Sequence, residues 1–198
     1  MQLRTPRLHI RPFESADTAV IHRILDLCFG DASLIGDADA LRERESWVQW
    51  SHLSPIWHER QHQPPYGEMA VVHSESDVLV GSVGYEPVLE PIEQLPGFGS
   101  GAAGMPGLFS PEVGLFWAVD PDQQGHGYAT EAATALIDHA FEHLRLKRIV
   151  ATTDYDNVAS QRVMVKVGMT LHHNPLPTPS HFQVLAVREH PLAARPTG

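Results

Sequence analysis

The sequence predicts an α+β fold built around a mixed β-sheet. Two β-rich runs, residues 68–73 and 78–85, are separated by a short polar turn, which is typical of an antiparallel hairpin. Further along, a strand at 112–119, a helix and a strand at 148–153 follow one another. This order favours a parallel strand pair joined by a helical crossover. Antiparallel and parallel pairing in one chain indicate a mixed sheet with helices packed against it.

Hydrophobic spacing predicts the elements around these strands. Apolar and polar residues alternate over 3–12, as in a half-buried strand, and apolar residues recur at helical spacing over 15–30. A second helical stretch covers 39–59, with Pro55 as the expected break. The remaining predicted elements are a helix after the 120–122 turn, a helix at 157–167, a strand at 168–172 and a strand at 182–187.

Residues 86–110 are dense in glycine and proline and show no core periodicity. Strand-like segments flank them on both sides, so we expect a surface loop inserted between neighbouring strands. The chain has 198 residues, 42% of them hydrophobic, which suffices for one core of normal size. We therefore expect a single domain over 1–198 that carries this insertion.

Composition excludes several classes of protein. Lys plus Arg is 14 against 24 for Asp plus Glu, and a net charge of −10 argues against nucleic acid as a partner. The single cysteine, Cys28, excludes an intramolecular disulfide and favours the reducing cytoplasm. No apolar window approaches the ~20 residues that cross a bilayer, so no membrane partner is expected. His139 and His143 have a metal-capable spacing without further ligands, and we expect no metal.

The segment 124–129 is a glycine-containing turn between a predicted strand and a predicted helix. Free backbone N–H groups and the positive end of the helix dipole meet at such a point, which favours phosphate binding. Gly125 and Gly127 allow the backbone to approach an anion closely. The dinucleotide fingerprint fits poorly, since the motif follows several strands and Thr130 replaces its third glycine. The P-loop lysine is absent as well. A tight turn into a core helix is the structural alternative.

This segment also carries a family resemblance. Gln124-x-x-Gly127-x-Ala129 is similar to the Q/R-x-x-G-x-G/A signature of the Gcn5-related N-acetyltransferase (GNAT) superfamily. Residues 156–169 resemble the N-x-x-S…K-x-G-F/M segment of its RimJ/RimL-like branch, which includes ribosomal-protein N-terminal acetyltransferases. The resemblance implies α/β/α layers and a mostly antiparallel sheet whose central parallel pair splays apart, with acetyl-CoA in the cleft.

The resemblance also implies cofactor contacts. The backbone N–H groups of residues 124–129 would bind the pyrophosphate, and residues 117–119 would pair with the pantetheine arm. Asn157 and Ser160 would lie near the pantetheine and the thiol. The predicted cofactor residues are thus Trp117, Ala118, Val119, Gln124, Gly125, His126, Gly127, Tyr128, Ala129, Asn157 and Ser160.

Acylation of an amine requires that the amine lose a proton and that the departing thiolate receive a hydrogen bond or a proton. Glu112 is the candidate base, because its distance from the cofactor loop is close to that of the catalytic glutamate in histone-acetylating members. A sheet-end carboxylate with a structural partner is the alternative. Ser160 is, by resemblance, the donor to the thiolate, and the alternative is a serine that caps or back-bonds within its helix.

The acceptor side is expected to include Trp47, Trp50 and Tyr85, with core packing as the alternative for these aromatic residues. The sequence thus predicts an acetyl-CoA-dependent N-acetyltransferase that acts on a primary amine by direct transfer in a ternary complex. The acceptor is a protein N-terminus or a small molecule, and the chain is a monomer or a homodimer. A non-catalytic CoA-binding regulatory module of the same fold is the alternative.

Overall fold

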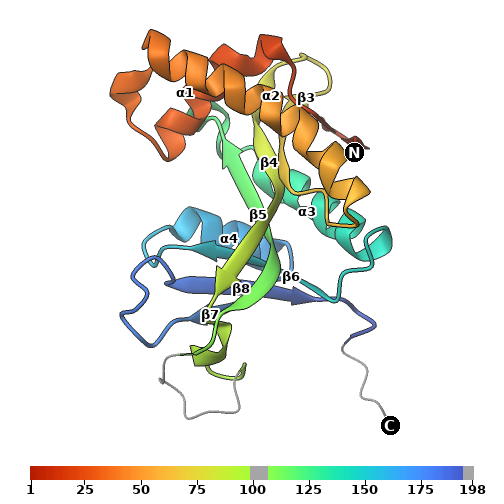
Figure 1. Cartoon of the computed structure of the whole chain (residues 1–198), viewed down its shortest axis with the longest axis vertical. Helices are drawn as coiled ribbons and strands as arrows, with labels where there is room; N and C mark the ends of the chain where they lie inside the picture. Colours follow the sequence, from red (N-terminus) through yellow and green to blue (C-terminus); the bar gives the residue numbers. More distant parts are fainter. Residues whose placement is uncertain (99–106, 194–198) are drawn as a thin grey trace. The chain divides into compact units, whose positions relative to one another are not determined.

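A computed structural model of the chain describes residues 1–98 and 107–193 (Figure 1). Within these residues it has an eight-stranded mixed sheet in the order β1-β2-β3-β4-β5-β6-β8-β7. β5 and β6 are parallel, with Gly114 opposite Val150, and the β1–β2, β2–β3, β3–β4, β6–β8 and β7–β8 pairs are antiparallel. The predicted mixed, mostly antiparallel sheet is confirmed. The strands are β1 Leu3–Arg4, β2 Leu8–Arg11, β3 Gly67–His73, β4 Leu79–Glu90, β5 Ser110–Val119, β6 Arg148–Thr153, β7 Thr170–His173 and β8 Val184–Glu189.

The helices follow the predicted periodicity. They are α1 Thr18–Cys28, α2 Ala38–Arg60, α3 Tyr128–Glu142 and α4 Val158–Lys166. Short 3₁₀ helices lie between these elements. They precede α1 (Ser15–Asp17), precede α2 (Ala32–Leu34), follow β4 (Ile92–Gln94) and follow β5 (Pro121–Gln123). No helix among the described residues is both long and apolar enough to cross a membrane.

The chain forms two compact units, which we describe separately. The first comprises residues 1–86 and 116–136, and the second comprises residues 87–115 and 137–198. Strands β4 and β5 and helix α3 run from one unit into the other.

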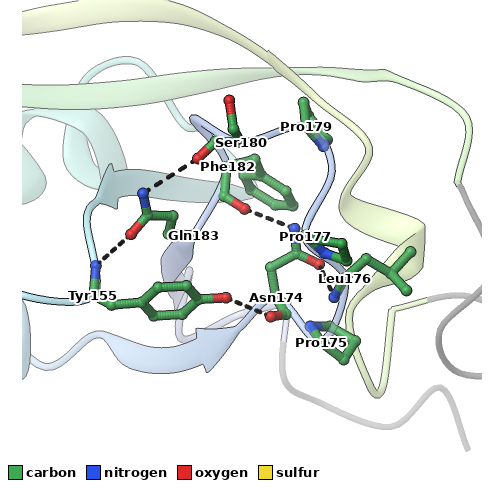
Figure 2. Close-up of a pocket in the computed structure, with 9 residues that line it drawn as sticks. All are labelled: Tyr155, Asn174, Pro175, Leu176, Pro177, Pro179, Ser180, Phe182 and Gln183. Atoms are coloured by element: carbon green, nitrogen blue, oxygen red, sulfur yellow. Dashed lines mark hydrogen bonds between the residues drawn. The ribbon is translucent and has the colours of Figure 1, made fainter.

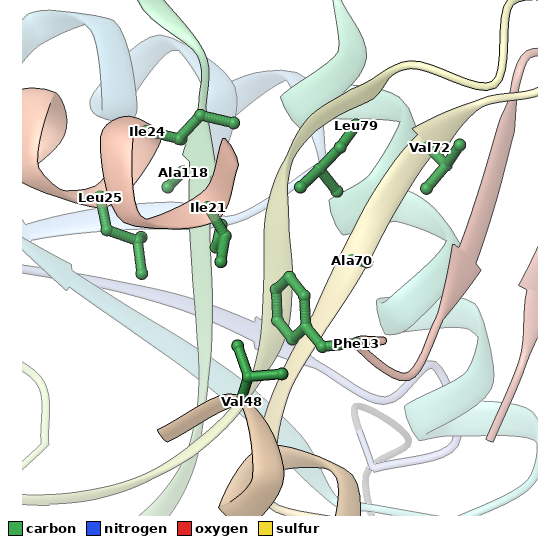
Figure 3. Packing of buried hydrophobic residues seen from close by; sticks show 9 residues of the cluster. All are labelled: Phe13, Ile21, Ile24, Leu25, Val48, Ala70, Val72, Leu79 and Ala118. Atoms are coloured by element: carbon green, nitrogen blue, oxygen red, sulfur yellow. The ribbon is translucent and has the colours of Figure 1, made fainter. Parts of the chain in front are cut away.

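The core of the first unit lies between α1, α2 and one face of the sheet (Figure 3). Ile21, Ile24 and Leu25 recur at helical spacing and so face the same side of α1. On the other face of the sheet, the buried Tyr85 Oη donates a hydrogen bond to the Leu136 carbonyl of α3 at 2.6 Å. Helices thus cover both faces of this part of the sheet, as α/β/α layering requires. The cluster consists of Phe13, Ile21, Ile24, Leu25, Val48, Ala70, Val72, Leu79 and Ala118.

The second unit has its own core under β6 and β8. Val150 and Leu185 are fully buried there, and Phe182 is 1% exposed. Val88 near the end of β4 belongs to the same cluster, which therefore joins residues from the first part of the glycine- and proline-rich segment to residues of β6 and β8. The cluster consists of Val88, Ile92, Leu95, Val150, Phe182, Leu185 and Val187.

Three predicted boundaries are wrong. The segment 3–12 is a hairpin and not one strand, because the chain reverses at Pro6, where the Thr5 N–H donates to the Leu8 carbonyl at 2.9 Å. The expected break at Pro55 is absent, and helix α2 continues through this residue. Proline removes only one hydrogen-bond donor from the helix, and beyond it the His58 ring contacts the Tyr66 carbonyl at 3.0 Å. The predicted loop at 86–110 begins later, because burial of Val88 extends β4 to residue 90. Part of that loop, 99–106, lies outside the described residues.

Candidate active site

The loop between β5 and α3 has the geometry of an anion-binding turn. Gly125 and Gly127 have φ values of +81° and +82°, a left-handed conformation that glycine adopts without strain. Just before them, the Asp120 side chain accepts a hydrogen bond from the Asp122 N–H at 3.1 Å and forms an ion pair with Arg23 of α1. The loop ends where α3 begins, so the first N–H groups of this 15-residue helix have no acceptor within the helix.

Glu131 in the first turn of α3 fastens this loop to the amino-terminal hairpin. Its Oε1 accepts hydrogen bonds from the Thr5 hydroxyl at 2.5 Å and the Arg7 N–H at 2.9 Å. Its Oε2 accepts from Arg7 Nε at 2.7 Å, while another nitrogen of this guanidinium donates to the His126 carbonyl at 3.0 Å. Arg7 also lies over the Tyr128 ring, 4.9 Å from its centroid. Sequence reasoning missed Arg7, whose contacts are more than a hundred residues away in the chain.

The Glu131 contacts predict acid-sensitive stability. Burial raises the pKa of this carboxyl, but the hydrogen bonds from Thr5 and Arg7 and the charge of Arg7 together lower it below its usual 4.5. A lowered pKa in the folded state stabilises the protein above pH 4.5, and this stabilisation is lost as the pH falls through the folded-state pKa. We expect Glu131→Gln to lower the free energy of unfolding at pH 7 by about 1–2 kcal/mol, since Arg7 is partly exposed.

Urea unfolding between pH 7 and pH 3 tests this expectation. The difference between Glu131→Gln and wild type shrinks below pH 4.5, whereas Glu142→Gln, an exposed position on the same helix, differs little at any pH. A difference between Glu131→Gln and wild type that is independent of pH contradicts the assignment.

The predicted pantetheine strand is the end of β5. Ala118 is 3% exposed and belongs to the first core, whereas Trp117 and Val119 are half-buried. The Val119 carbonyl accepts a weak hydrogen bond from the Cys28 thiol at 3.5 Å. Cys28 packs against the first core.

Glu112 has a structural partner. Its Oε2 accepts a hydrogen bond from Arg148 Nε at 2.8 Å, and its Oε1 accepts from a terminal nitrogen of the same guanidinium. The Glu112 side chain is 11% exposed, and the hydrogen bond and charge of Glu112 raise the pKa of Arg148. Both carboxylate oxygens therefore accept hydrogen bonds from Arg148, which favours the structural alternative for Glu112.

Asn157 and Ser160 begin helix α4. The Asn157 Oδ1 accepts a hydrogen bond from the Ser160 N–H at 3.1 Å, so Asn157 is the N-cap of this helix. Within the described part of the chain the Ser160 hydroxyl makes no hydrogen bond, and the side chain is partly exposed. These two residues and Glu112 belong to the second unit, whereas the 124–129 loop and residues 117–119 belong to the first.

The three aromatic residues predicted for the acceptor side have different surroundings. Trp47 of α2 packs on Phe13, with ring centroids 5.3 Å apart, and Trp50 is 55% exposed. Tyr85 is 1% exposed, which favours core packing over contact with an acceptor.

Two glutamates of the first unit carry perturbed pKa values, and sequence reasoning missed both. Burial raises the pKa of Glu68 on β3. The pKa of Glu86 on β4 is raised to about 7 by burial and, to a smaller extent, by the charge of Glu68. A signal was present in the alternation along 82–86, which places Glu86 on the same face as Ser82 and Gly84.

A pocket of about 370 Å³ lies in the second unit (Figure 2). Its polar groups mostly bond to one another: Tyr155 Oη donates to the Asn174 carbonyl at 2.5 Å, and Asn174 Nδ2 donates to the Phe182 carbonyl at 2.6 Å. The pocket has no carboxylate or imidazole, and the Tyr155 hydroxyl that lines it already donates to the Asn174 carbonyl. Its lining is Tyr155, Asn174, Pro175, Leu176, Pro177, Pro179, Ser180, Phe182 and Gln183. Among residues 1–98 and 107–193, no three His, Cys, Asp or Glu side chains form a group that could hold a metal ion.

The mixed sheet and the glycine turn at the start of α3 define an α+β domain with the geometry of an anion-binding turn, and comparison with known proteins identifies its family. The model of the acetyltransferase (GNAT) domain family matches residues 7–170. The chain therefore belongs to the GNAT family of acetyltransferases.

Individual relatives agree with this assignment. The chain is 45% identical over 58 residues to the uncharacterized N-acetyltransferase YnaD of Bacillus subtilis, a match that covers 29% of this chain and 33% of YnaD. The match thus spans about a third of that relative's length. A crystal structure of the acetyltransferase from Agrobacterium tumefaciens is 23% identical with a TM-score of 0.64, covering 96% of this chain and 95% of the other.

RimL, the ribosomal L7/L12 alpha-N-protein acetyltransferase, has the same fold in its complex with coenzyme A. It is 15% identical, with a TM-score of 0.62, and the match covers 96% of this chain and 98% of RimL. These structures establish the fold, which confirms the predicted GNAT fold class.

Proposed function

We propose that the chain is an N-acetyltransferase that transfers the acetyl group of acetyl-CoA directly to a primary amine in a ternary complex. The observation that carries the proposal is the turn at Gly125 and Gly127, whose left-handed glycines lead into the amino terminus of α3. Such a turn presents backbone N–H groups to a pyrophosphate. Residues 124–129 would bind the pyrophosphate, residues 117–119 the pantetheine arm, and Asn157 and Ser160 the region of the thiol, in one domain over 1–198.

The free hydroxyl of Ser160 supports its proposed role as hydrogen-bond donor to the departing thiolate. For the acceptor we favour a protein N-terminal amine, since RimL has the same fold. A small amine is the rival, because the microcin C7 self-immunity acetyltransferase MccE also shares the fold, at 11% identity and a TM-score of 0.63 over 93% of each chain. The single cysteine supports the cytoplasm as the location.

Calorimetric titration of the purified chain with acetyl-CoA, and with NAD and ATP as controls, tests the cofactor assignment. We expect a dissociation constant in the micromolar range for acetyl-CoA and no binding of the two nucleotides. Absence of acetyl-CoA binding overturns the proposal.

An amine panel then tests turnover. It contains spermidine, aminoglycosides and short peptides with free amino termini, and acetylation of any of them is followed by mass spectrometry. Intact acetyl-CoA binding without transfer to any member favours the regulatory CoA-binding module over the enzyme.

A further inference from the structure

Glu68 and Glu86 lie on one face of the sheet in the first unit. β3 and β4 pair so that Glu68 lies opposite Gly84, and Glu86 is two residues further along β4. Residues two apart on a strand point to the same side, so the two carboxylates are diagonal neighbours. Ala70 shares this face and belongs to the core packed under α1 and α2. The two carboxylates therefore point toward the side of the sheet that these helices cover.

The two glutamates differ in how they are held. Glu68 Oε2 accepts a hydrogen bond from the Ser82 hydroxyl at 2.8 Å, and the positive charge of Arg44 on α2 acts on it. Glu86 is partly exposed and makes no hydrogen bond or ion pair within the described part of the chain. Glu86 is thus a carboxylate with both oxygens available, unlike Glu112.

Among the residues that the structure describes, one charged side chain, that of Glu68, acts on Glu86. Arg44 acts on Glu68 and also lies 3.4 Å from Asp26 of α1. Continuation of the β3–β4 register places Tyr66, whose pKa is raised by burial, opposite Glu86. A carboxyl with a pKa of about 7 exchanges protons readily at neutral pH.

Helix α2 carries two buried hydroxyls, one of which lies in the same region. Ser51 is 1% and Ser54 6% exposed, and within the described residues neither Oγ has a hydrogen-bond partner. The Ser54 Oγ lies 3.1 Å from the position that a Cβ on Gly67 would take, so this hydroxyl faces β3 next to Glu68. Buried hydroxyls are normally hydrogen-bonded, so the Ser54 hydroxyl next to Glu68 has unused hydrogen-bonding capacity.

The position of Glu86 along β4 matches the direction proposed for the cofactor. The Asp120 N–H donates to the Val80 carbonyl, and a Cβ on Gly81 would meet the Ala118 carbonyl, so β4 and the end of β5 run antiparallel here. The path along β4 from Gly81 to Glu86 therefore runs beside β5 from Ala118 toward the amino-terminal end of that strand. That is the direction of the proposed pantetheine arm, over roughly 17 Å.

We propose that Glu86 accepts the proton that the acceptor amine releases, and that Glu68 binds the acceptor beside it. This inference rests on the proposed function. The acceptor ammonium first gives one proton to the Glu86 carboxylate, and the neutral amine nitrogen then forms a bond to the acetyl carbonyl carbon and releases its second proton to solvent. The C–S bond breaks, and the CoA thiolate takes a proton from solvent. Two carboxylates on this face favour an acceptor that arrives as a cation.

The pH dependence of kcat at saturating acceptor and acetyl-CoA tests the proposal, with the amine from the panel that is acetylated fastest. In wild type, kcat falls as the pH drops through about 7, because protonated Glu86 accepts no further proton. We expect Glu86→Gln to lower kcat by about 100-fold or more. The variant should also lose the acid limb of the pH profile, which is the fall of kcat below about pH 7, and should keep the dissociation constant of acetyl-CoA unchanged. Glu68→Gln removes a like charge, so the limb moves to lower pH.

Glu90→Gln on the same strand is the matched control and retains the wild-type profile. A Glu86→Gln variant with normal kcat, or a limb that is lost in Glu112→Gln and kept in Glu86→Gln, overturns the inference while the proposed function stands. Failure of wild type to bind acetyl-CoA or to acetylate any panel amine overturns the proposed function, and the inference with it.

An NMR titration tests the protonation of Glu86 without a measurement of turnover. In protein labelled with ¹³C at the glutamate carboxyl groups, one NMR resonance should titrate near pH 7, and it should be absent in Glu86→Gln. Titration of every glutamate carboxyl below pH 5.5 overturns the proposed role of Glu86.

Discussion

Replacement of Gly127 by valine is expected to weaken acetyl-CoA binding by at least about 100-fold. The residue has a φ of +82°, a conformation that is unfavourable for a β-branched side chain, so the turn must change its path. The backbone N–H groups would then no longer point at one anion. Loss of two charge-assisted hydrogen bonds, each worth about 1.5–3 kcal/mol, accounts for a loss of this size. A Cβ here would also lie 3.6 Å from the Arg7 guanidinium, which holds the loop.

Gly36→Val provides the matched control for this experiment. Gly36 has a φ of +92° and open space around its Cα, so the same substitution introduces a similar backbone strain outside the loop. Calorimetry with acetyl-CoA should show normal affinity for Gly36→Val, and thermal unfolding should show a similar loss of stability in both variants. Equal affinity of Gly127→Val and wild type would exclude this turn as the pyrophosphate site.

Gly81→Val is expected to destabilise the fold by about 3 kcal/mol or more. A Cβ at this position of β4 would lie 2.2 Å from the Ala118 carbonyl oxygen and 3.1 Å from the Val119 Cα. Nonbonded heavy atoms are most favourable at about 3.5–4.0 Å, so the two strands must separate. Valine is otherwise favoured in strands, and the loss therefore reports the close approach of the two backbones and not propensity.

Urea unfolding measures the effect of Gly81→Val, and Leu89→Ala on the same strand is the control. Leu89 is 61% exposed, so its truncation should change the free energy of unfolding by less than about 0.5 kcal/mol. Similar midpoints for Gly81→Val and wild type would show that β4 and β5 separate at little cost.

Local signals in the sequence predicted the part of the site that depends on backbone conformation. The glycines at 125 and 127 required a special turn, and the apolar stripe that follows required a helix, so local residue chemistry sufficed to locate the proposed cofactor loop. The predicted hairpin at 68–85 is confirmed, with Gly67 opposite Tyr85. These features depend on neighbours within a few residues.

Features that depend on distant partners could not be predicted. Arg148 is 36 residues from Glu112, and no spacing rule connects a residue near the start of one strand with the first residue of another. The hairpin at Pro6 was missed because its alternation continues on both sides of the reversal. Glu86 was assigned to a loop because Pro87 follows it, although burial of Val88 keeps that segment in the sheet.

The attachment of Glu131 to Thr5 and Arg7 links the two ends of the first unit energetically. A ligand that orders residues 124–129 also favours the state in which the amino-terminal hairpin is docked, because the same carboxylate holds both. If residues 124–129 are the proposed cofactor loop, cofactor affinity and the integrity of the first seven residues are thermodynamically coupled. We then expect deletion of these seven residues to weaken acetyl-CoA binding without removing an atom from the proposed loop, and bound acetyl-CoA to protect their amide hydrogens from exchange.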